Sequence, residues 1–242
     1  MTPAPRVTVT SRTRRVSVDA AGEGGIVQVE GGQARALPDG SFEVRGDRTG
    51  SGTIVVRCPP GSHVSVGTLT GPVETHGPLG EVRIVTETGK IRVERAERVD
   101  ARTRSGSVDV RWCAGECRLV TASSHVEVGS AGSVSIASQS GSVAAGSIGG
   151  GQVRTVSGSI HIGLATDPSP ASGLRVMSTS GGVEITVPQG SAHVARLTSS
   201  SGRIRSAVPS SAVPSSGEPG ESPAAAAIEV RTTSGSIRVE RR

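Results

Sequence analysis

The stretch TETGKIRVERAERVDARTRSGSVDVRW, from Thr86 to Trp112, contains the same phrase twice. The phrase is Thr, any residue, Thr or Ser, Gly, any residue, Ile or Val, any residue, Val. Its first hydroxyl residue, called the marker below, recurs at Thr86, Thr103, Thr121, Ser138, Thr155, Ser178, Ser199 and Thr232. Glycine follows three residues after every marker except Thr121, where Ser124 takes its place. A phrase that returns in this way predicts a repeat architecture.

The parity of the inward residues changes at each glycine. Ile84 and Thr86 are two residues apart, so they face the same side of an extended chain. Ile91 and Val93 have the opposite parity, so the chain must turn or bulge between the two pairs. Glycine tolerates the backbone angles of such a corner, and Thr and Ser hydroxyls can bond to the backbone of the corner itself. Gly89 and its equivalents are therefore predicted to be the corners of successive coils.

Coils of this kind predict an all-β fold, a parallel β-solenoid similar to a β-helix. One coil offers only about four small aliphatic side chains, at roughly 1.5–3 kcal/mol each when buried. Ordering its backbone costs about 1–2 kcal/mol per residue, so an isolated coil cannot hold itself together. Stacked coils share one core and pair their backbones. Helices are excluded because the apolar residues do not recur at helical spacing and the chain contains 34 glycines.

The chain divides into four parts on this interpretation. Residues 1–66 contain alternating strands broken by glycine and PDG turns, and they are predicted to form an irregular strand-rich cap at the N-terminal end. Residues 67–206 are the solenoid coils. Residues 207–227 are a low-complexity loop rich in Pro, Ser and Ala, expected to leave the solenoid. Residues 228–242 form a terminal coil that closes the stack.

The charges favour a structural role over nucleic-acid binding. The net charge is +5, carried almost entirely by arginine. Outward positions alternate in sign between neighbouring coils, as in the column of Arg83, Asp100 and Arg118, and such cross-strand pairs set register. A second column is expected to contain Glu87 and Arg104, and a third to contain Glu184 and Arg205. The nucleic-acid alternative rests on arginine clusters at the two ends of the chain: Arg12, Arg14, Arg15, Arg241 and Arg242.

No metal site or cofactor site is predicted. The histidines do not converge, whereas a metal centre needs several ligands together. Cys117 falls at an inward position and is expected to be a small buried thiol. Cys58 and Cys113 have no assigned role, and the odd total of three cysteines favours reduced thiols.

The chain is expected to be cytoplasmic. No apolar run approaches the ~18 residues of a membrane span. The first residues, MTPAPRVTVTSRTRR, are basic but have no apolar segment behind them, so they do not resemble a secretory signal.

One pair of carboxylates keeps an enzymatic alternative open. Asp109 and Glu127 are expected in the same outward column of adjacent coils, and paired carboxylates on a β-helix could act on a polysaccharide. The simpler interpretation is that two exposed acids repel weakly and are neutralised by Arg92, Arg111 or Arg118. On that interpretation the protein has no catalytic residues.

Several longer stretches resemble a known family. They are CPPGSHVSVGTLTGPVETHGPLGEVRIVTETGKIRVE, the recurring TxSGxIxV phrases, and VPQGSAHVARLTSSSGRIRSAV before a terminal TTSGSIRVERR. These stretches are similar to bacterial putative adhesins of the type common in actinobacteria, which are β-strand-repeat proteins of unknown function. The resemblance covers roughly residues 50–242. It implies a parallel β-solenoid and an adhesin-like role, and it supplies no catalytic or binding residues.

Together these features predict a non-catalytic scaffold or interaction module that presents a rigid repetitive surface to a protein or cell-envelope partner. The last strand, Ser236 to Arg242, is expected to form the exposed edge of the stack, with Arg238, Glu240, Arg241 and Arg242 blunting that edge against pairing with another chain. A monomer or small oligomer is therefore expected.

Overall fold

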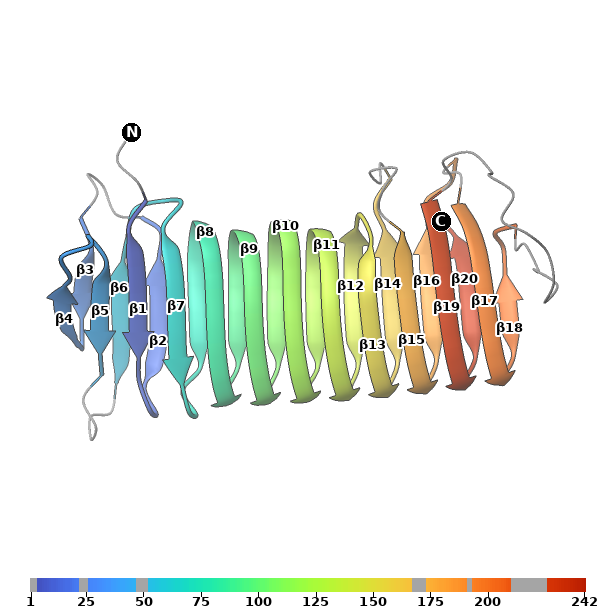
Figure 1. Cartoon of the computed structure of the whole chain (residues 1–242), viewed down its shortest axis with the longest axis horizontal. Coiled ribbons are helices and arrows are strands. Elements are labelled where there is room, and N and C mark those ends of the chain that lie inside the picture. Colours follow the sequence, from blue (N-terminus) through green and yellow to red (C-terminus); the bar gives the residue numbers. More distant parts are fainter. Residues whose placement is uncertain (1–3, 22–25, 47–51, 167–172, 191–192, 210–225) are drawn as a thin grey trace.

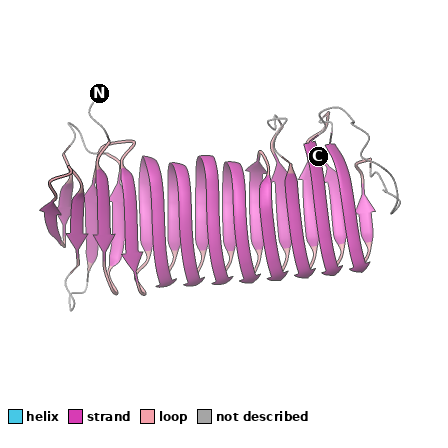
Figure 2. Cartoon of the chain, in the orientation of Figure 1, coloured by secondary structure: helices cyan, strands magenta, loops and turns pink. Residues whose placement is uncertain are grey.

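The protein is a long stack of flattened β-coils, as the computed structural model shows (Figure 1). The structure describes residues 4–21, 26–46, 52–166, 173–190, 193–209 and 226–242. These residues form twenty strands and no helix (Figure 2). All strand pairings are parallel except those of the short strands β3 (Gln28–Glu30) and β4 (Gln33–Ala36). The predicted parallel β-solenoid is confirmed.

Each coil has two walls. The wall that carries the marker residues is called the marker sheet, and the wall after the corner glycine is called the return sheet. Four strands run through both walls: β8 (Val73–Thr88), β9 (Ile91–Ser105), β10 (Val108–Ser123) and β11 (Val126–Ser140). The other marker-sheet strands are β1 (Arg6–Thr10), β5 (Phe42–Arg45), β7 (His63–Thr68), β13 (Gly151–Ser157), β15 (Leu174–Ser180), β17 (His193–Ser201) and β19 (Ala226–Ser234). The other return-sheet strands are β2 (Arg15–Asp19), β6 (Thr53–Arg57), β12 (Val143–Ile148), β14 (Ile160–Leu164), β16 (Val183–Val187), β18 (Ile204–Ser206) and β20 (Ile237–Arg241).

The core is a continuous column of small aliphatic side chains between the two walls. Ile84 of the marker sheet and Ile91 and Val93 of the return sheet are fully buried, as the parity switch predicts. The markers also point inward, and Thr103 Oγ1 donates a hydrogen bond of 3.0 Å to the Ser105 carbonyl. The equivalent bond from Thr155 Oγ1 to the Ser157 carbonyl measures 3.2 Å. Ser138 and Ser178 form the same bond within their own corners, whereas Thr86 Oγ1 donates at 3.3 Å to the Leu69 carbonyl of the neighbouring coil.

Backbone contact between coils is the main reason for glycine at the corners. Gly106 has a φ of +125°, and a Cβ there would lie 2.3 Å from the Gly89 carbonyl oxygen of the preceding coil. Gly158 has a φ of +130° and would place a Cβ 2.0 Å from the Gly141 oxygen. Gly89 does not have a positive φ, yet a Cβ there would still lie 2.7 Å from the Gly71 oxygen. A positive φ therefore explains only some of the corner glycines, and close contact with the backbone of the preceding coil explains the others.

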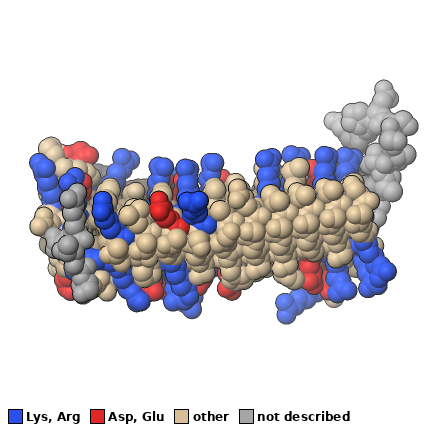
Figure 3. Space-filling model, turned by 90° about the horizontal axis from the view of Figure 1, so that it is seen from below, with Lys and Arg blue, Asp and Glu red and all other residues tan. Residues whose placement is uncertain are grey.

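The glycine corners lie along the lower side of the stack in Figure 1. Figure 3 views the molecule from that side and shows a band of uncharged residues over the C-terminal part of the stack, with charged side chains along both margins. At the corner that lacks glycine, the Thr121 and Ser124 hydroxyls are 2.5 Å apart and buried. Small residues therefore occupy the corners over this part of the stack.

The order of coils at the C-terminal end differs from their order in the sequence. β19 pairs with β15 on one side and β17 on the other, and β20 pairs with β16 and β18. The segment Ser236 to Arg242 is therefore not the edge of the stack, and the prediction that its charges blunt that edge is wrong. The outermost coil is formed by β17 and β18. Arg238 of β20 lies between Glu184 and Arg205, so the expected pairing of those two residues is also wrong.

The N-terminal end shows the same kind of reordering. β1 lies between β5 and β7, and β2 lies between β6 and β8. The strand-rich cap within residues 1–66 thus continues the parallel stack, and only β3 and β4 add antiparallel strands to it. Of the predicted low-complexity loop, residues 210–225 lie outside the described residues, so that prediction is not tested.

The close backbone contact between corner glycines predicts that a side chain at Gly106 destabilises the fold. Gly106→Ala should lower the melting temperature clearly, because positive-φ strain alone costs about 1–3 kcal/mol and the new Cβ would collide with the Gly89 carbonyl. Gly67→Ala is the matched control, since a Cβ at Gly67 meets nothing within 4 Å. Thermal unfolding followed by circular dichroism measures both. Equal melting temperatures for the two variants would contradict the claim that backbone contact between coils requires glycine at the corners.

Candidate binding groove

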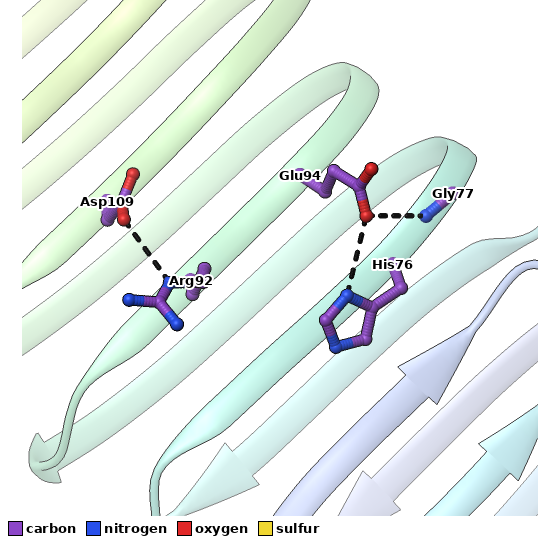
Figure 4. Close-up of polar contacts among 5 residues, drawn as sticks. All are labelled: His76, Gly77, Arg92, Glu94 and Asp109. Carbon is purple, nitrogen blue, oxygen red and sulfur yellow. Dashed lines mark hydrogen bonds and ion pairs between the residues drawn. The ribbon is translucent and has the colours of Figure 1, made fainter.

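The carboxylates considered for catalysis each lie beside a basic side chain on the outer face of the return sheet. Asp109 and Glu127 align in register on β10 and β11, as expected. Arg92 Nε, however, lies 3.3 Å from Asp109 Oδ2, which Figure 4 shows as a bridge between adjacent coils. Glu127 Oε2 lies 3.9 Å from a ring nitrogen of His125. Arg92 therefore neutralises Asp109, as the simpler interpretation expects, whereas the neighbour of Glu127 is a histidine.

Other ionisable side chains on this face form the same type of contact. Glu94 Oε2 lies 3.4 Å from His76 Nδ1 and accepts a hydrogen bond of 3.4 Å from the Gly77 amide (Figure 4). His161 Nδ1 lies 3.1 Å from Glu184 Oε2. Among the described residues, no three of His, Cys, Asp and Glu converge on a point where a metal ion could bind. These contacts link neighbouring coils and leave the acids paired.

The three cysteines are buried free thiols. Cys117 fills the inward position expected for it, and burial of Cys58 raises the pKa of that thiol. Cys113 lies beside Cys117 where the ladder of β10 is bulged. The hydrogen bond between these two thiols lowers the pKa of Cys113, and the same bond together with burial raises the pKa of Cys117. The thiols belong to the core and are not exposed to a reactant.

A long hollow lies on the outer face of the marker sheet and is called the marker groove. It has a volume of about 990 Å³ and runs across the strands from β8 to β17. Its walls are two columns of outward side chains, which stand on either side of the buried marker residues. The column before the markers contributes Val85, Arg102, Val120, Ala137, Arg154, Met177, Arg231 and Thr198, and the column after them contributes Arg104, Ala122, Gln139, Val156, Thr179, Thr233 and Ser200.

The charged groups that line this groove are all arginines. They are Arg102, Arg104, Arg154 and Arg231, and no acidic residue of the described chain lines the groove. Arg102 is paired with Asp100 at 3.2 Å and Arg231 with Glu229 at 2.6 Å, both partners lying outside the groove. Arg104 and Arg154 form no ion pair with any described residue. The groove lining is therefore positively charged, and Glu87 of β8, which aligns with Arg104 as the sequence predicts, lies just outside that lining.

Apolar side chains are also exposed in the marker groove. Val85, Val120, Val156 and Met177 are between 36% and 54% exposed. This groove was not predicted from the sequence, where the outward residues were considered only for their charge. A signal was present, since these apolar residues have the parity that points out of the marker sheet.

The terminal arginines do not form one surface. Arg12, Arg14 and Arg15 lie near β1 and β2 at one end of the stack, whereas Arg241 ends β20 near the other (Figure 1). Arg15 is also 3.8 Å from Glu74. The two arginine clusters therefore lie at opposite ends of the stack and do not combine into one basic stripe of the kind typical of nucleic-acid-binding proteins.

The described part of the chain contains no helix long and apolar enough to span a membrane.

Comparison with known proteins identifies a family for almost the whole chain. The family model described as Toastrack DUF4097 matches residues 5–240. No curated protein matches the sequence significantly.

Two crystal structures are similar over most of their length. A putative adhesin from Bacteroides fragilis is 12% identical with a TM-score of 0.39, over 98% of this chain and 91% of that chain. A putative cell adhesion protein from Clostridium sporogenes is 9% identical with a TM-score of 0.21, over 99% of this chain and 93% of that chain. Both TM-scores are too low to support an argument about structure.

The ion pairs beside the groove predict a pH-dependent contribution to stability. Desolvation opposes ionisation of Glu229, but Arg175 at 2.9 Å and Arg231 at 2.6 Å outweigh it and lower the pKa of Glu229 below 4.5. A lowered folded-state pKa stabilises the fold above the unfolded pKa, and the effect is lost as the pH falls through the folded value. Glu229→Gln should therefore lower the free energy of unfolding at pH 7 and have no effect in strong acid. Urea unfolding at several pH values measures this, and a penalty independent of pH would contradict it.

Proposed function

We propose that this chain, which belongs to the Toastrack DUF4097 family, is a non-catalytic, adhesin-like interaction module. Its partner is a protein or a cell-envelope component, and the marker groove receives an acidic, extended segment of that partner. The observation that carries the proposal is the charge of the groove, which is lined by four arginines and by no acid of the described chain. Arginine binds carboxylate and phosphate in a two-pronged geometry, so these side chains suit an anionic ligand.

The solenoid supports this role because it fixes the positions of the arginines in advance. Coils repeat at roughly 4.8 Å, and Arg104 and Arg154 belong to strands three coils apart. Their backbones are therefore about 14 Å apart along the stack. A ligand that reaches both must be extended along the axis of the stack. Because the backbone ladder already orders the groove, binding loses little conformational entropy.

The exposed apolar residues add a second type of contact. Val120 lies on β10, between the coils that carry Arg104 and Arg154. A partner segment that alternates acidic and apolar groups would therefore contact both kinds of side chain. Buried apolar area adds about 25 cal/mol per Å², while the charges select the sign of the ligand.

The enzymatic alternative has weaker support. Asp109 is held by Arg92 at 3.3 Å, and Glu127 lies on the outer face of the return sheet, the wall opposite the groove. The absence of catalysis stays a prediction, and a panel of polysaccharides tests it through release of reducing sugars. The cytoplasmic location also stays a prediction, which cell fractionation tests.

Binding of an acidic polymer to the groove tests the proposal. Arg104→Gln combined with Arg154→Gln should weaken binding of fluorescent polyglutamate or polygalacturonate at least tenfold at low salt, because both unpaired groove charges are lost. The comparison of the two probes distinguishes a peptide from a glycan as the preferred chemistry. Fluorescence anisotropy measures the dissociation constants.

The matched control removes the same charge elsewhere. Arg98→Gln combined with Arg111→Gln changes two exposed arginines that do not line the groove. This variant should bind nearly as well as the unmodified protein. Equal weakening in both double variants would show nonspecific attraction to a basic protein and would overturn the groove as the binding site.

A further inference from the structure

The C-terminal coil occupies a position between two coils that precede it in the sequence. The two preceding coils are β15–β16 and β17–β18, and β19–β20 pairs with both of them in parallel. The connection from β16 to β17 comprises residues 188–192, and in it the Gln189 amide donates a hydrogen bond of 2.9 Å to the Arg242 carbonyl at the end of the inserted coil. The connection from β18 to β19 is the much longer segment 207–225.

Coils β17–β18 and β19–β20 follow the same template in the same register. Marker Ser199 aligns with marker Thr232, and Leu197 aligns with Val230. On the return sheet Ser206 aligns with Val239. Coil β17–β18 therefore has the pairing pattern needed to stack directly on β15–β16 if the inserted coil were absent.

Burial explains why the C-terminal coil takes the inner position. Ile228, Val230, Ile237 and Val239 are at most 1% exposed, so each fills the core. At two of these four positions β17–β18 has a smaller or more polar residue, with Ala195 beside Ile228 and Ser206 beside Val239. Ile204 remains 41% exposed at the end of the stack. Inserting the more apolar coil thus buries more surface than stacking the chain in sequence order.

We propose that the space between β15–β16 and β17–β18 is a slot for residues 226–242 and that a second copy of this chain can supply those residues. The contacts in the slot are the same whichever molecule provides the coil. A connection of the length of residues 207–225 spans up to about 60 Å when extended, so it does not confine the coil to its own slot. Tethering to the same chain gives the coil an effective concentration of about the millimolar range. Protein at a comparable concentration therefore exchanges coils to form dimers.

A peptide of residues 226–242 tests the slot in the full-length chain. Ile237→Asp combined with Val239→Asp disables the chain's own coil, because both side chains are fully buried in the slot. The fluorescent peptide should bind this variant with one-to-one stoichiometry, and it should bind the unmodified chain at least tenfold more weakly. A peptide that carries the same two substitutions is the control and should not bind either protein. Fluorescence anisotropy measures all four combinations.

A milder variant guards against loss of the fold. Val239→Ser places a serine in β20, at the position that aligns with Ser206 of the neighbouring coil. The Val239→Ser protein should bind the peptide more strongly than the unmodified chain does. Circular dichroism confirms that both variants keep their β-structure. A variant that folds but does not bind the peptide would overturn the proposal. Collapse of the whole fold in both variants would overturn it too, because the proposal requires the remaining coils to stand without the inserted one.

Discussion

Close contact between the backbones of successive coils is the constraint on which the rest of the structure depends. Parallel pairing holds neighbouring strands roughly 4.8 Å apart, and the corners must keep that spacing where the chain reverses. A Cβ at Gly158 would lie 2.0 Å from the carbonyl oxygen below it, so a side chain there would force two coils apart. Glycine at the corner lets both walls stay in register, and inward Val and Ile then fill the space between them.

The outer surface is a consequence of that register. Each outward position becomes a straight column, as in the predicted row of Arg83, Asp100 and Arg118, which the structure confirms. Other outward columns form ion pairs between coils, as Arg92 does with Asp109 and Arg175 with Glu229. The marker groove differs because its arginines outnumber acids and valines stand between them. The binding surface is therefore formed by the types of outward side chain that align in successive coils, without a loop or a local change in the backbone.

Much of the fold follows from the sequence, because parity and glycine spacing are local signals. The inward markers, the corner at Gly106 and the burial of Cys117 were all predictable from the repeat. The spatial order of the coils at the ends could not be predicted. Residues 193–206 and 226–242 follow the same template, so the local sequence pattern does not show which of the two coils lies further inside the stack. Their order depends on total burial, which favours Val239 over Ser206 in the inner position. The groove was missed because exposed valines in a strand look like ordinary β-formers.

Amide hydrogen exchange at the corners tests the central claim most directly. The Gly158 amide donates to the Ser180 carbonyl and the Gly181 amide to the Ser234 carbonyl, both at 3.2 Å. Close backbone stacking predicts that these two amides exchange as slowly as those of the buried strands, and protection of Gly181 further requires the inserted C-terminal coil. Exchange at the rate of an open loop at both glycines would contradict the account.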